Sequence, residues 1–269
     1  MNLYYILVFL NMILWFHKAT GFYQAGGFFM IEINHVSKTF GTKKAVDDIT
    51  VTIPTGCITG FIGPNGAGKT TSIHMMTGVL QPDSGSIKLN GKDISKDPIN
   101  AKREFGLVPD NPDLFLRLSG LEYINFMADI YHIDTATRDA RIKTLAEEFE
   151  IKDALNDRMS SYSHGMRQKA ILIATLVIDP NIWILDEPMT GLDPASSYLL
   201  KEKMKEHAHQ GNTVIFSTHV LEVAERLCDK IIIIDHGKIR YDGTLEDLKA
   251  QYPEKESLED VFLEVTKHA

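Results

Sequence analysis

The feature that most constrains this 269-residue chain is a glycine-rich segment that joins an apolar run to a helical pattern. Residues 63–71 read GPNGAGKTT and match G-x-x-x-x-G-K-[ST], with the apolar run 57–62 before them and a helix-like stretch after them. Glycines let the backbone turn tightly so that successive N–H groups point at phosphate oxygens, and a helix N-terminus favours anions. The segment therefore predicts a site for a nucleoside triphosphate. The expected contacts are Gly63, Pro64, Asn65, Gly66, Ala67, Gly68, Lys69, Thr70 and Thr71.

Two residues of this phosphate loop have specific expected roles. The Lys69 ammonium is expected to reach the β- and γ-phosphates, and the Thr70 hydroxyl is expected to bind Mg²⁺. A lysine supplies charge to the phosphates, and a hydroxyl oxygen is a ligand that a hard cation accepts. The loop thus predicts both a nucleotide and a metal ion.

A second candidate site follows the apolar run IWIL at residues 182–185, which ends in Asp186 and Glu187. A buried strand that ends in adjacent carboxylates can offer one of them to a metal ion and the next to an attacking water. Asp186 is therefore predicted to hold Mg²⁺ or its water shell. Glu187 is predicted to be the general base or to orient the water.

The chain alternates strand-like and helix-like segments along most of its length. Strand patterns occupy 30–54 and recur at 105–108, 182–186, 213–217 and 230–235, while helical periodicity dominates residues 119–155 and the stretch after 163. Such alternation predicts an α/β fold with a largely parallel sheet covered by helices. We expect one domain over residues 30–269, with a helical subdomain at about 111–177.

The composition narrows the class of protein further. The net charge is −8, with 24% charged and 44% hydrophobic residues, which is ordinary for a globular protein and makes nucleic acid an unexpected partner. Two cysteines indicate no disulfide framework.

The apolar run 3–16 is too short to span a bilayer and has no basic stretch before it. Residues 1–29 are therefore expected to lie outside the fold, which we expect to start at Met30.

The segment YSHGMRQK at residues 162–169 gives the family resemblance. It is similar to the LSGGQ signature of the nucleotide-binding subunits of ABC transporters, and the other motifs follow in that family's order. The resemblance implies an adenine-stacking ring, a metal-proximal residue of the Q-loop, a D-loop aspartate and a switch histidine. These positions are Phe40, Asp110, Asp193 and His219, respectively. The ending LEDVFL at 258–263 resembles the branch that exports drugs, bacteriocins, lipids or polysaccharides.

The resemblance also implies a fold and a mode of action. The fold would be a P-loop NTPase with an N-terminal antiparallel β subdomain and a helical insert that carries the signature. Two such subunits, identical or different, would pair head to tail around two ATP molecules. Each ATP would lie between the phosphate loop of one subunit and Ser163 and Gly165 of the other. Hydrolysis would drive a separate transmembrane permease, most simply for export, from the cytoplasmic face of the membrane.

Three positions depart from the family pattern. His164 replaces the first glycine of the signature, Met166 replaces its glutamine, and Asp110 replaces the glutamine of the Q-loop. Ser163 and Gly165 are retained, so a helix that begins there can still bind an anion. We expect these departures to affect the rate of hydrolysis and the metal geometry rather than the class of protein.

Two other functions use similar motifs. A soluble ABC-type ATPase of DNA repair or translation is one alternative, but such proteins usually carry paired cassettes, zinc-binding insertions or long coiled coils, and none is visible in the sequence. A small-molecule kinase or GTPase is another, but it would not require the 162–169 signature, and the guanine-reading motif N-K-x-D of GTPases does not occur. The sequence therefore favours the transporter subunit.

Overall fold

The computed structural model describes residues 29–113, 115–255 and 257–267 of the chain. The expectation for the N-terminal extension lies outside these residues, except that Phe29 already belongs to the first strand. The strands are β1 (Phe29–Phe40), β2 (Lys43–Pro54), β3 (Ile58–Ile62), β4 (Ser84–Leu89), β5 (Lys92–Asp93), β6 (Phe105–Val108), β7 (Ile182–Leu185), β8 (Thr213–Thr218), β9 (Lys230–Asp235) and β10 (Lys238–Thr244).

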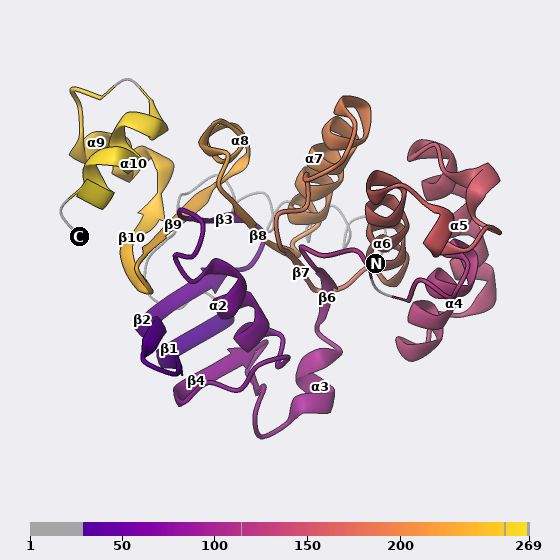
Figure 1. The fold of residues 1–269 in the computed structure, drawn as a ribbon, viewed down its shortest axis with the longest axis horizontal. Helices are drawn as coiled ribbons and strands as arrows, with labels where there is room; N and C mark the ends of the chain where they lie inside the picture. Colours follow the sequence, from indigo (N-terminus) through magenta and orange to yellow (C-terminus); the bar gives the residue numbers. More distant parts are fainter. Residues whose placement is uncertain (1–28, 114, 256, 268–269) are drawn as a thin grey trace, which may run out of the picture.

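The helices cover the sheets and extend the domain at two sides, as Figure 1 shows. They are α2 (Lys69–Met76), α3 (Pro98–Lys102), α4 (Gly120–Ile130), α5 (Thr135–Glu148), α6 (His164–Ile178), α7 (Pro194–His209), α8 (Leu221–Leu227), α9 (Leu245–Gln251) and α10 (Leu258–Lys267). Two single 3₁₀ turns, Lys152–Ala154 and Met159–Ser161, lead from α5 to α6. Among the described helices, none is both long and apolar enough to cross a membrane.

The N-terminal strands form a four-stranded sheet in the order β2-β1-β4-β5, and each neighbouring pair is antiparallel. Along β2, side chains such as Ile49, Val51 and Ile53 are buried, whereas the residues between them are more exposed. This period of two is the pattern of a sheet with one covered face. The predicted antiparallel β subdomain is therefore confirmed.

The second sheet has six strands in the order β10-β9-β3-β8-β7-β6, and every pair from β9 to β6 is parallel. The central strands β3, β7 and β8 are buried along their whole length, as expected for strands with helices on both faces. Because parallel strands end at the same edge, the loops after β3, β7 and β8 lie close together. These loops carry the predicted site residues.

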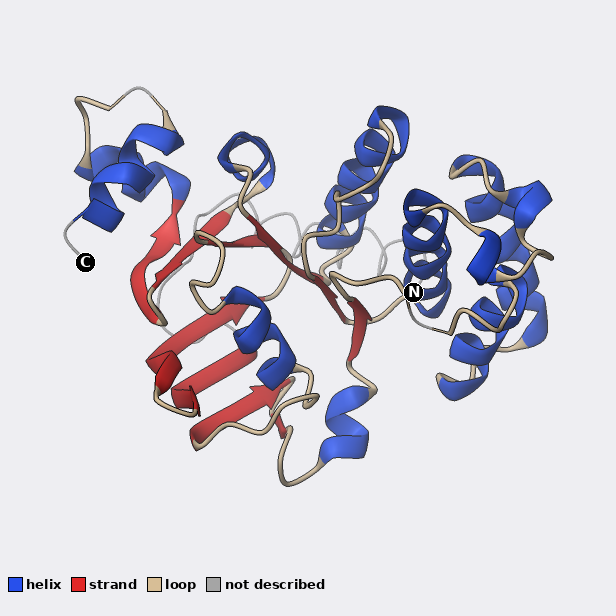
Figure 2. Ribbon diagram, viewed as in Figure 1, coloured by secondary structure: helices blue, strands red, loops and turns tan. Residues whose placement is uncertain are grey.

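Helix α2 lies between the two sheets, as Figure 2 shows. Its buried Ile73, Met75 and Met76 belong to one hydrophobic cluster with Ile33 of β1 and Ile232 of β9. The helix that follows the phosphate loop is thus held by a core that both sheets share.

The helices α4, α5 and α6 form a group beyond β6, at one end of the molecule (Figure 1). Helix α4 begins with a capping box in which Ser119 accepts from the Glu122 N–H and the Glu122 carboxylate accepts from the Ser119 N–H. The fold is the predicted α/β class. The division into 30–269 and a helical subdomain at about 111–177 stays a prediction.

Candidate nucleotide site

The phosphate loop lies between β3 and α2, at the edge where the parallel strands end. Gly68 adopts φ +115°, and a Cβ atom there would lie 2.6 Å from the Ala45 carbonyl oxygen, so the position requires glycine. No side chain caps the start of α2. The first turn of the helix therefore offers its N–H groups to an anion rather than to a capping residue.

Lys69 is held against the loop that precedes it. Its side chain is only 6% exposed, and Nζ donates to the carbonyl oxygens of Gly63 at 2.7 Å and Pro64 at 3.3 Å. The same Nζ lies 3.5 Å from Oε1 of Glu187. A buried ammonium at this place is well situated to meet phosphate oxygens.

Asp186 is almost completely buried at the end of β7. Burial raises the pKa of its carboxyl group, hydrogen bonds from Ser217 and Thr70 lower it, and the carboxylates of Asp110 and Glu187 raise it. The Ser217 hydroxyl donates to Oδ1 at 2.5 Å. The other oxygen, Oδ2, is buried and has no hydrogen-bond partner among the described residues. A free, buried carboxylate oxygen beside the phosphate loop is the kind of atom that a cation would satisfy.

The oxygen donors around Asp186 fit Mg²⁺. The Thr70 hydroxyl and the Asp110 carboxylate are both near enough to Asp186 to affect its pKa. In the part of the chain that the structure describes, no three His, Cys, Asp or Glu side chains group closely enough to hold a metal. Mg²⁺ commonly takes one or two carboxylates and completes its shell with phosphates and waters, so this sparse set agrees with a magnesium–nucleotide site.

Glu187 has a left-handed backbone, with φ +47°, which is uncommon for a residue other than glycine. Its N–H donates to the Ser217 hydroxyl oxygen at 2.9 Å. Its carboxylate lies between a histidine and a lysine: Oε2 is 3.0 Å from His219 Nδ1, and Oε1 faces Lys69. A cavity of about 260 Å³ borders Glu187 and His219. The arrangement can orient a water molecule and accept its proton.

The starts of two further helices, α6 and α7, carry other predicted residues. Ser163 caps α6 by accepting from the Met166 N–H at 3.3 Å. Asp193 caps α7 by accepting from Ser196, and it also pairs with Lys169 at 2.8 Å. The hydrogen bond from Lys169 is the largest cause that holds the pKa of Asp193 well below its usual range, and the Ser196 N–H and hydroxyl act in the same direction.

The signature helix and the loop after Glu187 pack tightly. A Cβ atom at Gly165 would lie 2.5 Å from the Gly191 carbonyl oxygen. A Cβ atom at Gly191 would in turn lie 2.3 Å from the ring of His164. The close approach explains why position 165 must be small, and it gives the unusual His164 a contact within its own subunit.

The structure thus brings most of the predicted residues into two groups. The first group surrounds the phosphate loop and contains Lys69, Thr70, Asp110, Asp186, Glu187 and His219; the second contains Ser163, Gly165 and Asp193. The loop 187–193 joins them. Phe40 lies apart at the end of β1, half exposed, with the Lys38 ammonium 5.8 Å from its ring centroid.

Three residues in contact with this site, Ser217, Gln168 and Lys169, have no role assigned from the sequence, although Gln168 and Lys169 belong to the signature segment. Ser217 bonds both Asp186 and Glu187, although it lies in the next strand. Its sequence signal is a hydroxyl at the carboxyl end of a buried apolar strand. Gln168 and Lys169 lie on α6 and contact the loop 187–193.

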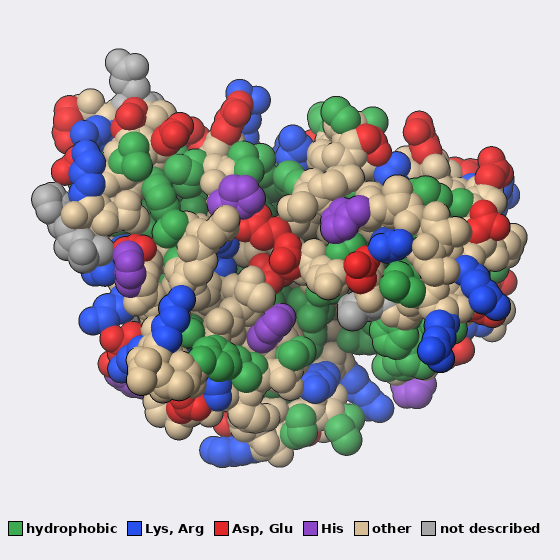
Figure 3. Space-filling model, viewed as in Figure 1, with side chains coloured by type: hydrophobic (Ala, Val, Ile, Leu, Met, Phe, Trp, Pro, Cys, Tyr) green, Lys and Arg blue, Asp and Glu red, His purple; other side chains and the backbone are tan. Residues whose placement is uncertain are grey.

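Acidic side chains lie at the surface of the molecule near this site. Figure 3 shows acidic side chains gathered near the centre of one face of the molecule, in the region where β7 and β8 lie in Figure 1. Bare carboxylates at the surface attract cations, so the face is suited to a metal-bound nucleotide rather than to a free polyanion.

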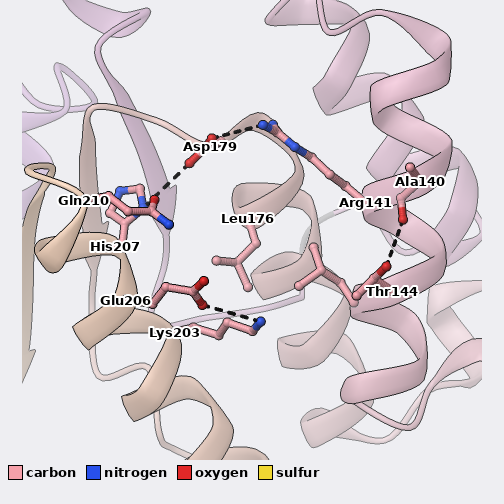
Figure 4. A pocket seen from close by; sticks show the side chains of 10 residues that line it. Ala140, Arg141, Thr144, Leu176, Asp179, Lys203, Glu206, His207 and Gln210 are labelled. Carbon is pink, nitrogen blue, oxygen red and sulfur yellow. Dashed lines mark hydrogen bonds and ion pairs between the residues drawn. The ribbon is translucent and has the colours of Figure 1, made fainter. Parts of the chain in front are cut away.

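A separate cavity of about 380 Å³ lies between α5, α6 and α7 (Figure 4). Its charged side chains pair with one another: Asp179 lies 3.0 Å from Arg141 and 3.8 Å from His207, and Lys203 lies 3.7 Å from Glu206. None of the predicted nucleotide residues lines it. The cavity is therefore not part of the nucleotide site.

Comparisons with known proteins show the family to which the chain belongs. The ABC transporter family profile matches residues 46–190. The ABC-type transporter ATP-binding protein EcsA of Bacillus subtilis (strain 168) is 34% identical over 239 residues, which cover 88% of this chain and 97% of EcsA. The ABC transporter ATP-binding protein NatA of the same organism is 36% identical over 224 residues, which cover 81% of this chain and 91% of NatA.

Solved structures extend the agreement to three dimensions. The structure of an ATP binding subunit of an ABC transporter has a TM-score of 0.84 at 32% identity and covers 88% of this chain and 100% of that one. A dimeric ATP-binding cassette in a post-hydrolysis state, bound to ADP and Pi, has a TM-score of 0.73 at 21% identity, which shows the fold alone; the match covers 80% of this chain and 99% of that one. The chain is an ATP-binding ATPase and belongs to the ABC transporter family.

Proposed function

We propose that this chain is the ATP-hydrolysing subunit of an exporter, and that it pairs with a second ATP-binding subunit around two ATP molecules. The observation that carries the proposal is the position of the Glu187 carboxylate, 3.5 Å from Lys69 and 3.0 Å from His219. A carboxylate beside the residue expected to bind the γ-phosphate can activate the attacking water. The histidine can contact the same phosphate.

The chain's own residues have distinct roles in this proposal. The phosphate loop and Lys69 bind the phosphates, and Phe40 stacks on the adenine ring. Thr70, Asp186 and Asp110 would hold Mg²⁺, and the bound ion would neutralise charge that develops on the phosphates. Glu187 takes the proton of the attacking water, which then adds to the γ-phosphorus as the bond to ADP breaks.

The second subunit would complete each site. Ser163 and Gly165 lie at the start of α6, where free N–H groups and the helix dipole favour an anion. The proposal places the γ-phosphate of the partner's ATP there, so that ATP joins the subunits. Asp193 belongs to the loop that links this helix start to Glu187 in the same chain.

Export is supported by names among the relatives. Daunorubicin/doxorubicin resistance protein DrrA of Streptomyces peucetius is 33% identical over 82% of this chain, and the Nod factor export protein of Burkholderia lata is 33% identical over 77%. We propose that this chain also drives export, from the cytoplasmic face of the membrane.

An exposed aromatic patch supports contact with such a permease. Phe115 and Phe126 are 48% and 43% exposed, their ring centroids lie 5.7 Å apart, and Ile130 continues the patch along α4. Phe115 follows Asp110 by five residues. A permease segment seated on the patch could therefore influence the metal-binding end of this loop.

Copurification tests the proposal. The full chain should be recovered with a multi-span membrane protein, and Phe115→Ser with Phe126→Ser should reduce that recovery without reducing ATP affinity. Leu263→Ser is the matched control, because Leu263 is 50% exposed on α10, which lies at the other end of the molecule from α4 (Figure 1). Recovery without any membrane protein, together with normal ATP hydrolysis, would favour the soluble ABC-type ATPase instead.

A further inference from the structure

Gln168 connects the signature helix to the residue that follows the proposed general base. It lies on α6, five residues after the cap Ser163, and its side chain is only 1% exposed. Its Nε2 donates to the carbonyl oxygen of Pro188 at 3.2 Å. Pro188 is the neighbour of Glu187, so the bond reaches the backbone next to the reacting carboxylate.

Packing alone does not account for an amide at this position. The other amide atom of Gln168, Oε1, is buried and has no hydrogen-bond partner among the described residues. A buried polar atom without a partner costs free energy that an apolar side chain of similar size would avoid. The remaining bond to Pro188 is therefore the feature that distinguishes Gln168 from a leucine or methionine.

The backbone that this bond holds is strained. Glu187 has φ +47°, a conformation that a residue with a side chain keeps only when its surroundings enforce it. Ser217 holds the residue on one side, by accepting from the Glu187 N–H. Gln168 holds it on the other side, at the next carbonyl group.

We propose that Gln168 is a positioning residue for Glu187. Its amide fixes the Pro188 carbonyl group. Together with the Ser217 hydroxyl at the Glu187 N–H and the Thr190 N–H at the Glu187 carbonyl oxygen, it keeps Glu187 in the left-handed conformation in which its carboxylate faces Lys69 and His219. This inference rests on the proposed role of Glu187. It also joins the start of α6 to the catalytic carboxylate of the same subunit.

Neighbouring contacts do not replace this bond. Gly165 approaches Gly191, and Lys169 pairs with Asp193, so both act on the later part of the loop. Gln168 acts at Pro188, directly beside the strained residue. Loss of its donor should let Glu187 relax while the rest of the loop stays attached to α6.

The test compares Gln168→Met with Thr175→Val in the full chain. Thr175 is a matched control because it is also fully buried on α6, and it accepts from Trp183 Nε1 at 3.2 Å, away from the loop. Thr175→Val should lower the melting temperature, because it leaves the buried Trp183 N–H without an acceptor. Only Gln168→Met should lower kcat, by about tenfold to a hundredfold, because a small displacement of a catalytic group costs that much. The equilibrium Kd for ATP should stay within about twofold in both.

A second variant keeps the inference testable if Gln168→Met does not fold. Gln168→Asn retains a polar amide but shortens the side chain, so its donor cannot reach Pro188, and the same selective fall in kcat is expected. A normal kcat in the folded variant, or an equal fall in Thr175→Val, would overturn the inference.

Glu187→Gln in the same assay separates the two proposals. If it hydrolyses ATP normally, the proposed role of Glu187 fails; if it is inactive while the Gln168 variants are normal, only the positioning role fails.

Discussion

The Nζ atom of Lys69 lies 3.5 Å from Oε1 of Glu187, and both side chains are largely buried. One residue opens α2 and the other follows β7, so the parallel sheet brings together two groups that are far apart in the sequence. A phosphate bound by Lys69 would lie directly beside the carboxylate. In the proposed mechanism the roles of the two groups are nevertheless separable, because Lys69 would contact the bound nucleotide and Glu187 would contact the attacking water.

Glu187→Gln should leave ATP binding intact and reduce turnover by about a hundredfold or more, since the amide keeps the shape but cannot accept the proton. The nucleotide-bound dimer should accumulate, because its opening follows hydrolysis. Steady-state phosphate release and size-exclusion chromatography with ATP measure both effects. Near-normal turnover would remove Glu187 from the catalytic role.

Lys69→Ala should instead weaken ATP binding by about tenfold or more, because hydrogen bonds to charged groups contribute roughly 1.5–3 kcal/mol. Equilibrium titration with ATP measures the change. Lys152→Ala is the control, since Lys152 pairs with Glu147 at the surface, outside the site. An unchanged Kd in Lys69→Ala would contradict the phosphate-loop assignment.

Asp186→Asn should stabilise the free protein at neutral pH while abolishing hydrolysis that depends on Mg²⁺. Burial raises the pKa of Asp186 above its ordinary value, so the folded protein holds the neutral form more readily than the unfolded chain does. The stability that this group contributes is present below the unfolded pKa and is lost as the pH rises through the folded pKa. The difference in melting temperature between variant and wild type should therefore grow as the pH rises from about 4. A variant that melts lower at neutral pH would contradict the cost of this buried charge.

Gly165→Asp should spare ATP binding by the isolated subunit but suppress ATP-driven dimerisation. The new side chain would crowd the γ-phosphate of the partner's ATP. In addition, its Cβ atom would have to displace the Gly191 carbonyl oxygen of its own subunit. Mixing Gly165→Asp with Lys69→Ala subunits leaves one composite site intact. Analytical ultracentrifugation with ATP should detect the mixed dimer, and its complete absence would count against two subunits sharing each ATP.

The sequence predicted those parts of the site whose residues are contiguous. The phosphate loop, the pair Asp186 and Glu187, and the cap Ser163 each depend on local order, so their positions at the ends of strands and helices could be inferred. The helical periodicity at 119–155 also corresponds to α4 and α5.

Contacts between distant segments could not be predicted in the same way. Ser217 bonds Asp186 and Glu187 from another strand, and Gln168 reaches Pro188 from another helix, so both depend on the tertiary fold. The strand order of the six-stranded sheet is equally non-local. The left-handed backbone of Glu187 has no sequence signal, because glutamate does not favour it.

The position of α2 between the two sheets has a consequence for how ATP affects the whole domain. A ligand present at a hundred times its Kd stabilises the folded state by about 2.7 kcal/mol. Because α2 shares one hydrophobic cluster with β1 and β9, the phosphate loop cannot open fully without disturbing both sheets. Nucleotide should therefore slow amide hydrogen exchange in the antiparallel and the parallel sheet together, although its phosphates touch neither core.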